Sequence, residues 1–181
     1  MKFNNAPAYS EEPRENPPPK TYPARLIGAW DIGKQKPFNP EDEAKNQIIL
    51  VYDLLGKEKM SDGKNFTVFE FLTQSLHVKS TLAKRLKVLG APIRQQNENW
   101  FEITDDAFSV ADMLGNPCMI EVGVNSKGNA KVTNVMAPMD GISIAESQAD
   151  YGWIDLDDPS WETNYSAAPK WIKKRIDERI R

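Results

Sequence analysis

The sequence predicts a mainly β fold with some α-helix, in which five strands flank a helical insert and a further helix ends the chain. Three observations indicate this class. Short runs rich in β-branched and aromatic residues recur along the 181 residues. The apolar period becomes helical between the third and fourth of these runs, and isoleucines recur every four residues at the C-terminal end.

The first two strands are predicted over residues 21–31 and 47–55. In the first, apolar residues alternate from Tyr22, and Gly28 marks either a bulge or a close approach of backbone. Gly33 and the Pro37–Pro40 stretch are expected to end this strand. The second is almost continuously apolar, as expected of a strand that is covered on both faces.

The third strand is predicted over residues 66–73, after a turn at Asp62-Gly63. A period of two places Val68 and Leu72, with Phe66, on one face of this strand. The same period places Phe69 and Phe71 on the other face, beside two threonines.

The insert begins with a helix over residues 81–89, for which Ser80 is the expected N-cap and Gly90 the C′ residue. A second short helix is expected over residues 107–114 with Thr104 as its cap. Strands at 118–124 and 130–136 follow as a hairpin. The resulting order is that of a five-stranded oligonucleotide/oligosaccharide-binding (OB) Greek-key barrel with a helical insert between strands 3 and 4.

Charge is distributed unevenly along the chain. The net charge is −3, but residues 140–169 alone carry −7, whereas residues 20–139 carry +1. The acidic pI of about 5.3 therefore does not argue against a core that binds a polyanion. These features divide the chain into a disordered, proline-rich segment (1–20), an OB-fold nucleic-acid-binding domain (21–139) and an acidic aromatic arm with a C-terminal amphipathic helix (140–181).

The sequence offers few candidates for catalysis. His77 is the only histidine and Cys118 the only cysteine, which excludes a disulfide framework and a cysteine-based zinc finger. His77 is expected to order a corner between strand and helix, and Cys118 to be a small core residue. The pairs at 105–106 and 157–158 lack the spacing of a calcium loop. We therefore predict a protein that is not an enzyme, without cofactor or metal.

Aromatic residues interleaved with bases are the stronger signal. Single-stranded nucleic acid is bound by flat apolar faces that stack on bases and by cations that follow the phosphates. The candidate nucleic-acid-binding residues are Arg25, Trp30, Lys34, Tyr52, Lys64, Phe69, Phe71 and Lys79.

Each of these features also has a structural interpretation. The rings of Trp30, Tyr52, Phe69 and Phe71 could instead form the barrel core. The bases of residues 79–94 could be the solvated face of a helix or extend a positive track. The acidic stretch could be solvated, or could compete with DNA for a basic groove and recruit partners. The helix from Pro169 is too short to be stable alone, so it is expected to dock.

Several short runs resemble small tailed-phage proteins of the single-stranded-DNA-binding class. The resemblance covers roughly residues 20–139 and the C-terminal helix. The runs that carry it are Tyr22-Pro23-Ala24-Arg25, Asp31-Ile32-Gly33-Lys34-Gln35, Tyr52-Asp53-Leu54-Leu55-Gly56, Ser61-Asp62-Gly63-Lys64-Asn65-Phe66, Thr73-Gln74-Ser75-Leu76-His77-Val78-Lys79-Ser80, Met113-Leu114-Gly115-Asn116-Pro117-Cys118 and Pro169-Lys170-Trp171-Ile172. The resemblance implies an OB fold in a phage replication or recombination module. Bacterial single-strand binders end in an acidic tip with a terminal aromatic, and this chain does not.

The leading hypothesis is a non-catalytic protein of the host cytoplasm that coats single-stranded DNA with little sequence preference. The expected partners are single-stranded DNA and a phage helicase, primase or polymerase contacted through residues 140–181. A homodimer is compatible with the open edges of such a barrel, and no membrane partner is expected because no apolar run is long enough. The alternative is an OB-like module that binds a phage or host replication protein.

Overall fold

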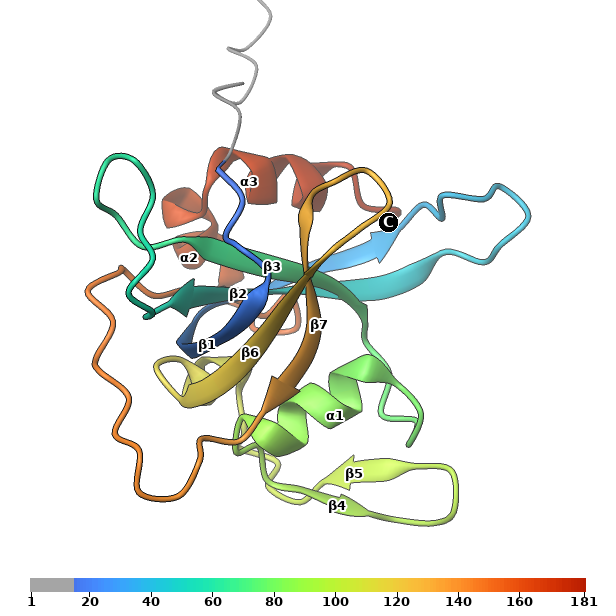
Figure 1. Ribbon diagram of the computed structural model, residues 1–181. Helices are drawn as coiled ribbons and strands as arrows, with labels where there is room; N and C mark the ends of the chain where they lie inside the picture. Colours follow the sequence, from blue (N-terminus) through green and yellow to red (C-terminus); the bar gives the residue numbers. More distant parts are fainter. Residues whose placement is uncertain (1–14) are drawn as a thin grey trace, which may run out of the picture.

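The computed structural model describes residues 15–181, and an antiparallel sheet with helices on both faces is its main feature (Figure 1). The hydrogen-bonded order of the five main strands is β3-β2-β1-β6-β7. Their bounds are β1 Lys20–Gln35, β2 Lys45–Leu54, β3 Thr67–Thr73, β6 Pro117–Val124 and β7 Ala130–Met136. Within residues 15–181, no hydrogen-bonded ladder joins β3 to β7. The fold is therefore mainly β with some helices, as predicted, and its five main strands are antiparallel. The sheet does not close into the predicted five-stranded barrel.

The long strand β1 connects the two halves of the sheet. Its first residues, Lys20–Arg25, pair with β6, and its later part pairs in parallel with β8 (Gly152–Ile154). The register with β2 shifts between Leu26 and Gly28, which confirms the bulge expected at Gly28. The expected end of the strand at Gly33 is wrong. Gly33 adopts a φ of 68° at a second register shift, and the strand continues past it.

The alternation predicted for β3 is confirmed. Val68 and Leu72 are buried, as is Phe66, which precedes the strand, whereas Phe69 and Phe71 lie on the opposite face. β2 pairs with β3 along its length and is itself covered on both faces.

The insert between β3 and β6 contains the predicted helix and an unpredicted hairpin. In α1 (Thr81–Val88), Ser80 Oγ accepts a hydrogen bond from the N–H of Ala83, and Gly90 follows with a φ of 84°. The short strands β4 (Ile93–Gln95) and β5 (Phe101–Ile103) pair next to it. The helix expected over 107–114 is instead a 3₁₀ turn, η1 (Val110–Met113). Ser109 and Asp112 form its capping box, so Thr104 is not the cap.

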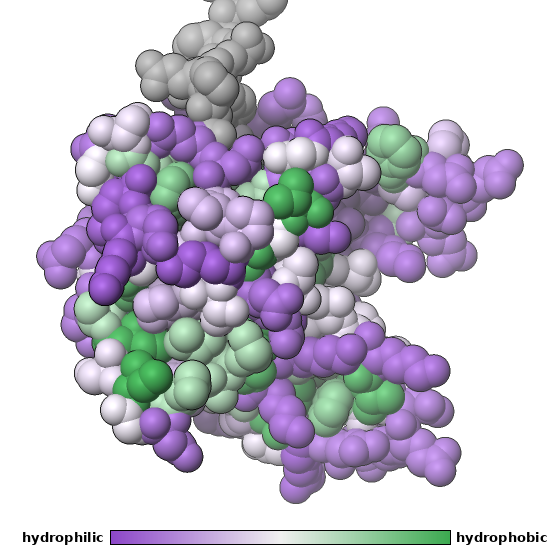
Figure 2. Space-filling model, viewed as in Figure 1, coloured by the Kyte–Doolittle hydropathy of each residue, from purple (hydrophilic) through white to green (hydrophobic). Residues whose placement is uncertain are grey.

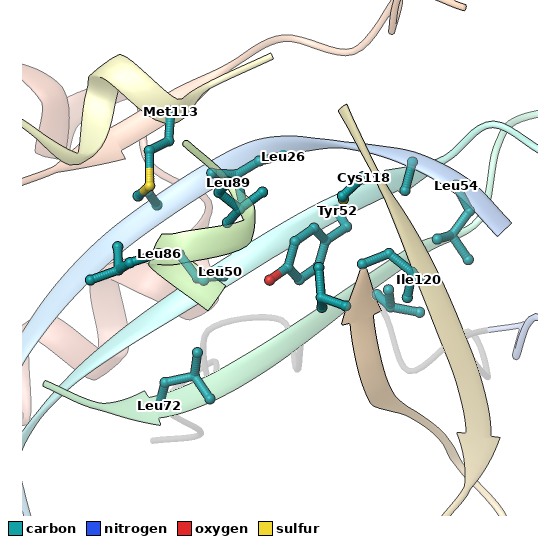
Figure 3. Close-up of a cluster of buried hydrophobic side chains, with 14 of the residues drawn as sticks. Leu26, Leu50, Tyr52, Leu54, Leu72, Leu86, Leu89, Met113, Cys118 and Ile120 are labelled. Carbon is teal, nitrogen blue, oxygen red and sulfur yellow. The ribbon is translucent and has the colours of Figure 1, made fainter. Parts of the chain in front are cut away.

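One hydrophobic core lies between the sheet and α1. Figure 3 shows Leu50 and Tyr52 of β2 pointing towards Leu86 of α1, with Cys118 and Ile120 of β6 beside them. These side chains come from strands and a helix that are distant in sequence, so this core fixes the insert against the sheet.

A second core covers the opposite face of β1 and β2. It is formed with the C-terminal region, in which α2 (Trp161–Ala167) and α3 (Lys170–Asp177) follow β8. Ile172 and Ile176 of α3 are fully buried, which confirms that the C-terminal helix docks. Among the described residues, no helix is long and apolar enough to span a bilayer.

Candidate nucleic-acid interface

Three aromatic rings meet on the outer face of β3. The ring centroids of Phe69 and Trp171 are 5.1 Å apart, those of Phe69 and Phe71 are 5.7 Å apart, and those of Phe71 and Trp171 are 6.4 Å apart. We call Phe69, Phe71 and Trp171 the aromatic cluster. Burial of Ile172 against the sheet brings its neighbour Trp171 to β3. Phe71 keeps 40% of its surface exposed, so the cluster presents an accessible ring.

A cation lies directly beside this ring. The guanidinium carbon of Arg175 is 5.1 Å from the centroid of Phe71, within the range of a cation–π contact. Arg175 is one turn after Trp171 on α3, so both project from the helix towards β3. The cluster therefore combines a partly exposed ring with a positive charge above it.

A groove of about 890 Å³ runs between β3 and β7, next to this cluster. The β3–β7 groove is lined by Glu15, Asn16, Pro17, residues 67–72, Thr81, Arg85, Asn125, Asn129, Ala130, Lys131, Val132 and Thr133. The hollow at the right-hand edge of Figure 2 is a different feature, because the 36–44 connection, β4 and β5 that border it do not line the groove.

An ion pair neutralises one of the two acidic groups on the wall of this groove, that of Glu70. The carboxylate of Glu70 accepts hydrogen bonds from Arg85 Nη2 at 2.8 Å and from Arg85 Nε at 3.1 and 3.2 Å. Both side chains are 8% exposed. The groove therefore offers amides from Asn16, Asn125 and Asn129 and one lysine, together with the carboxylate of Glu15, which accepts from the N–H of Ser61.

Three of the predicted site residues, Arg25, Trp30 and Tyr52, have structural roles. Arg25 donates hydrogen bonds of 2.7 Å to the carbonyls of Gly115, Ile144 and Ala145. Its guanidinium is thereby committed to holding the 144–146 segment, and the prediction of a phosphate contact loses its basis.

Trp30 and Tyr52 are buried, so neither ring can stack on a base. Trp30 lies in the second core beneath Gly152, where an added Cβ would be 2.3 Å from the indole ring. Tyr52 is fully buried and donates a 3.0 Å hydrogen bond to Glu70. Burial of Tyr52 raises the pKa of its hydroxyl well above its usual value, and the negative charge of Glu70 adds to this shift.

The predicted lysines are exposed but are not brought together. Lys34 lies near the end of β1, where it pairs with the start of β2, and Lys64 lies in the connection after the end of β2. These two residues are therefore at opposite ends of the sheet strands. Lys79 precedes α1, and its backbone N–H donates to Nδ1 of His77.

The residues considered for catalysis take structural positions. The Nδ1 atom of His77 accepts a backbone hydrogen bond at the corner between β3 and α1, as the structural interpretation expected. Cys118 is fully buried, which raises the pKa of its thiol to about 12. Residues 15–181 contain no group of three or more potential metal ligands.

Trp171, Arg175 and Trp100 are site candidates that the sequence did not single out. The spacing of Trp171 and Arg175 by four residues was the available signal, but it does not identify the strand that they meet. Comparison with protein-family models, curated proteins and solved structures finds no match to this chain.

Proposed function

We propose that this protein binds single-stranded DNA without catalysis, along the outer face of β3 and the β3–β7 groove. The observation that carries the proposal is the aromatic cluster, with Phe71 exposed beneath Arg175. A base stacked on an accessible ring contributes about 1–3 kcal/mol irrespective of sequence, and a neighbouring cation attracts the phosphate. Binding of this kind has little sequence preference.

The strand order supports the finer interpretation that the fold is of the OB type. β1, β2 and β3 form a meander, a helix follows β3, and the β6–β7 hairpin pairs with the other side of β1. OB folds bind oligonucleotides on the face of their second and third strands and between two loops. In this chain, β3 contributes Phe71, and the β6–β7 turn contributes Asn125 and Asn129 to the groove.

The groove chemistry agrees with a single strand as ligand. Its volume lies within the roughly 300–1,000 Å³ of sites that hold small ligands. Amide side chains donate to base edges, and those of Asn16 and Asn125 are oriented by backbone N–H groups that donate to their Oδ1 atoms. Lys131 supplies a charge for the backbone. The proposed role of this protein in a phage replication or recombination module rests on the sequence resemblance alone.

A fluorescence titration with oligo(dT) tests the proposal. We expect oligo(dT) to bind at low salt, to bind less tightly at high salt, and to be preferred over duplex DNA. Phe71→Ala should weaken binding by about 5- to 150-fold, as expected for one lost stacking contact. Arg175→Gln should weaken it and reduce its salt dependence.

Matched controls separate these effects from general changes. Tyr151→Ala removes an aromatic side chain of similar exposure (44%) outside the cluster, and Arg181→Gln removes an exposed charge at the chain end. Neither should change the affinity appreciably. Absence of a complex at low salt, or equal binding by wild type and Phe71→Ala, would refute the proposed site.

A second candidate function is recognition of a replication protein through residues 140–181. Met139, directly before this region, and Ile142 within it are 63% and 49% exposed, which favours a protein contact there. Met139→Glu with Ile142→Glu should abolish such a contact and leave oligo(dT) binding intact. Loss of both activities would argue against a separate protein site.

A further inference from the structure

We infer that Trp100, held against His77, is a second base-stacking platform, and that a single DNA strand extends to it from the aromatic cluster. This inference rests on the proposed function and extends the binding site to the β4–β5 hairpin. The rings of Trp100 and His77 form an edge contact with centroids 5.2 Å apart. Trp100 nevertheless keeps 46% of its surface exposed.

The backbone around Trp100 is fixed by hydrogen bonds on both sides. Its N–H donates to Asn97 Oδ1 at 3.0 Å, and its carbonyl accepts from the N–H groups of Gln96 and Asn97. His77 forms an isolated antiparallel bridge with Trp100. A ring that is anchored in this way loses little conformational freedom when a base stacks on it, and this favours binding.

The surroundings suit a phosphate backbone. Lys79, adjacent to the platform through its hydrogen bond to His77, is exposed. From residue 79 to residue 97 the chain carries no acid and five bases, of which Arg85 is buried in its ion pair with Glu70. Two acids follow in the hairpin: Glu102 pairs with Arg94, and Glu98 is exposed. The local balance of charge remains positive, as attraction of a polyanion requires.

The chain path connects the two sites. β3 carries Phe71 towards its end and continues through residues 74–76 to His77, which bridges to Trp100 of the hairpin. In Figure 1 this hairpin lies beside α1, across the sheet from α3, so a DNA strand that joins the two sites passes the open edge of β3. Phe71 and His77 are six positions apart, which is at most about 20–22 Å of extended chain. A single strand rises by about 3.4 Å per nucleotide when its bases stack as in the duplex, and by up to about twice that when it is extended, so about three to six nucleotides cover this distance. A strand of twelve nucleotides can therefore reach both sites, whereas one of two cannot.

The test compares (dT)2 and (dT)12 on the full chain at low salt. We expect Trp100→Ala to weaken (dT)12 binding by about 5- to 150-fold and to leave (dT)2 binding unchanged, whereas Phe71→Ala weakens both. Trp100→Phe retains a smaller ring and should lie between wild type and Trp100→Ala for (dT)12. Tyr151→Ala serves as the control of similar exposure and should bind both oligonucleotides normally.

The outcomes separate the two proposals. Equal (dT)12 affinity of wild type and both Trp100 variants overturns the platform and leaves the proposed function in place. Absence of (dT)12 binding by the wild type overturns both. Circular dichroism of each variant establishes that it is folded. If Trp100→Ala is unfolded, Trp100→Phe decides by the same comparison, with unchanged (dT)12 affinity counting against the platform.

Discussion

Replacement of Arg85 by methionine should destabilise the protein strongly. Arg85→Met retains most of the apolar side chain but removes the guanidinium that contacts both oxygens of Glu70. The hydroxyl of Tyr52, at 3.0 Å, then remains as a donor to the carboxylate. Removal of one partner from a buried pair costs about 3–5 kcal/mol, and these side chains are each 8% exposed. We therefore expect the free energy of unfolding to fall by about 3–5 kcal/mol.

Urea unfolding followed by circular dichroism measures this change. Glu70→Gln alone should also be destabilising because it leaves Arg85 without a charged partner. The double variant should lose less than the sum of the two, with a coupling energy of about 2–3 kcal/mol. Lys20→Met breaks the exposed pair with Glu58 and serves as the control, with an expected loss below about 1 kcal/mol. A loss that small for Arg85→Met would refute the reasoning.

Three further predictions concern buried positions. Cys118 should resist a thiol reagent at pH 8 until the chain is unfolded. The pKa of its thiol is about 12 in the folded chain and near 9 in the unfolded chain, so its contribution to stability is complete below about pH 9 and is lost as the pH rises towards 12. Alkaline unfolding measures this loss. Ile176→Ala should cost about 2–5 kcal/mol of unfolding free energy, whereas Ile180→Ala, at a 38% exposed position, should cost much less; equal losses would contradict the docking geometry. Gly152→Ala should lower stability by about 1–3 kcal/mol through a clash with Trp30, and an unchanged melting temperature would show that β8 can move away.

Local sequence signals predicted most of the elements. The cap at Ser80, the alternation through Val68 and Leu72 and the bulge at Gly28 each depend on a few neighbouring residues, and the structure confirms all three. The prediction of a helix over residues 107–114 was wrong for an equally local reason. Ser109 and Asp112 cap a single turn from inside the predicted helix.

Assignment of the site residues depended on contacts between distant parts of the chain. The sequence shows that Trp30 and Phe71 lie on strands, but not that the C-terminal region covers one and leaves the other accessible. Arg25 is held by carbonyls at residues 115, 144 and 145, about 90 to 120 positions away. No local sequence pattern predicts a contact between residues so far apart in the chain.

The same long-range packing changes how the acidic arm must be tested. Deletion of residues 140–181 would also remove β8 and α3, and so expose Trp30 and Ile49 on the sheet. The shortened chain would lose the burial of Ile172 and Ile176, at about 1.5–3 kcal/mol each, and its DNA affinity would reflect a damaged fold.

Replacement of exposed carboxylates by amides avoids this difficulty. Asp150→Asn, Asp157→Asn and Glu162→Gln together remove three negative charges at exposed positions without shortening a side chain. If the arm competes with DNA, the triple variant should bind oligo(dT) more tightly than wild type, and the gain should shrink as salt rises because the competing charges are screened. An unchanged affinity at low salt, with an unchanged melting temperature, would mean that these carboxylates do not compete with the DNA backbone.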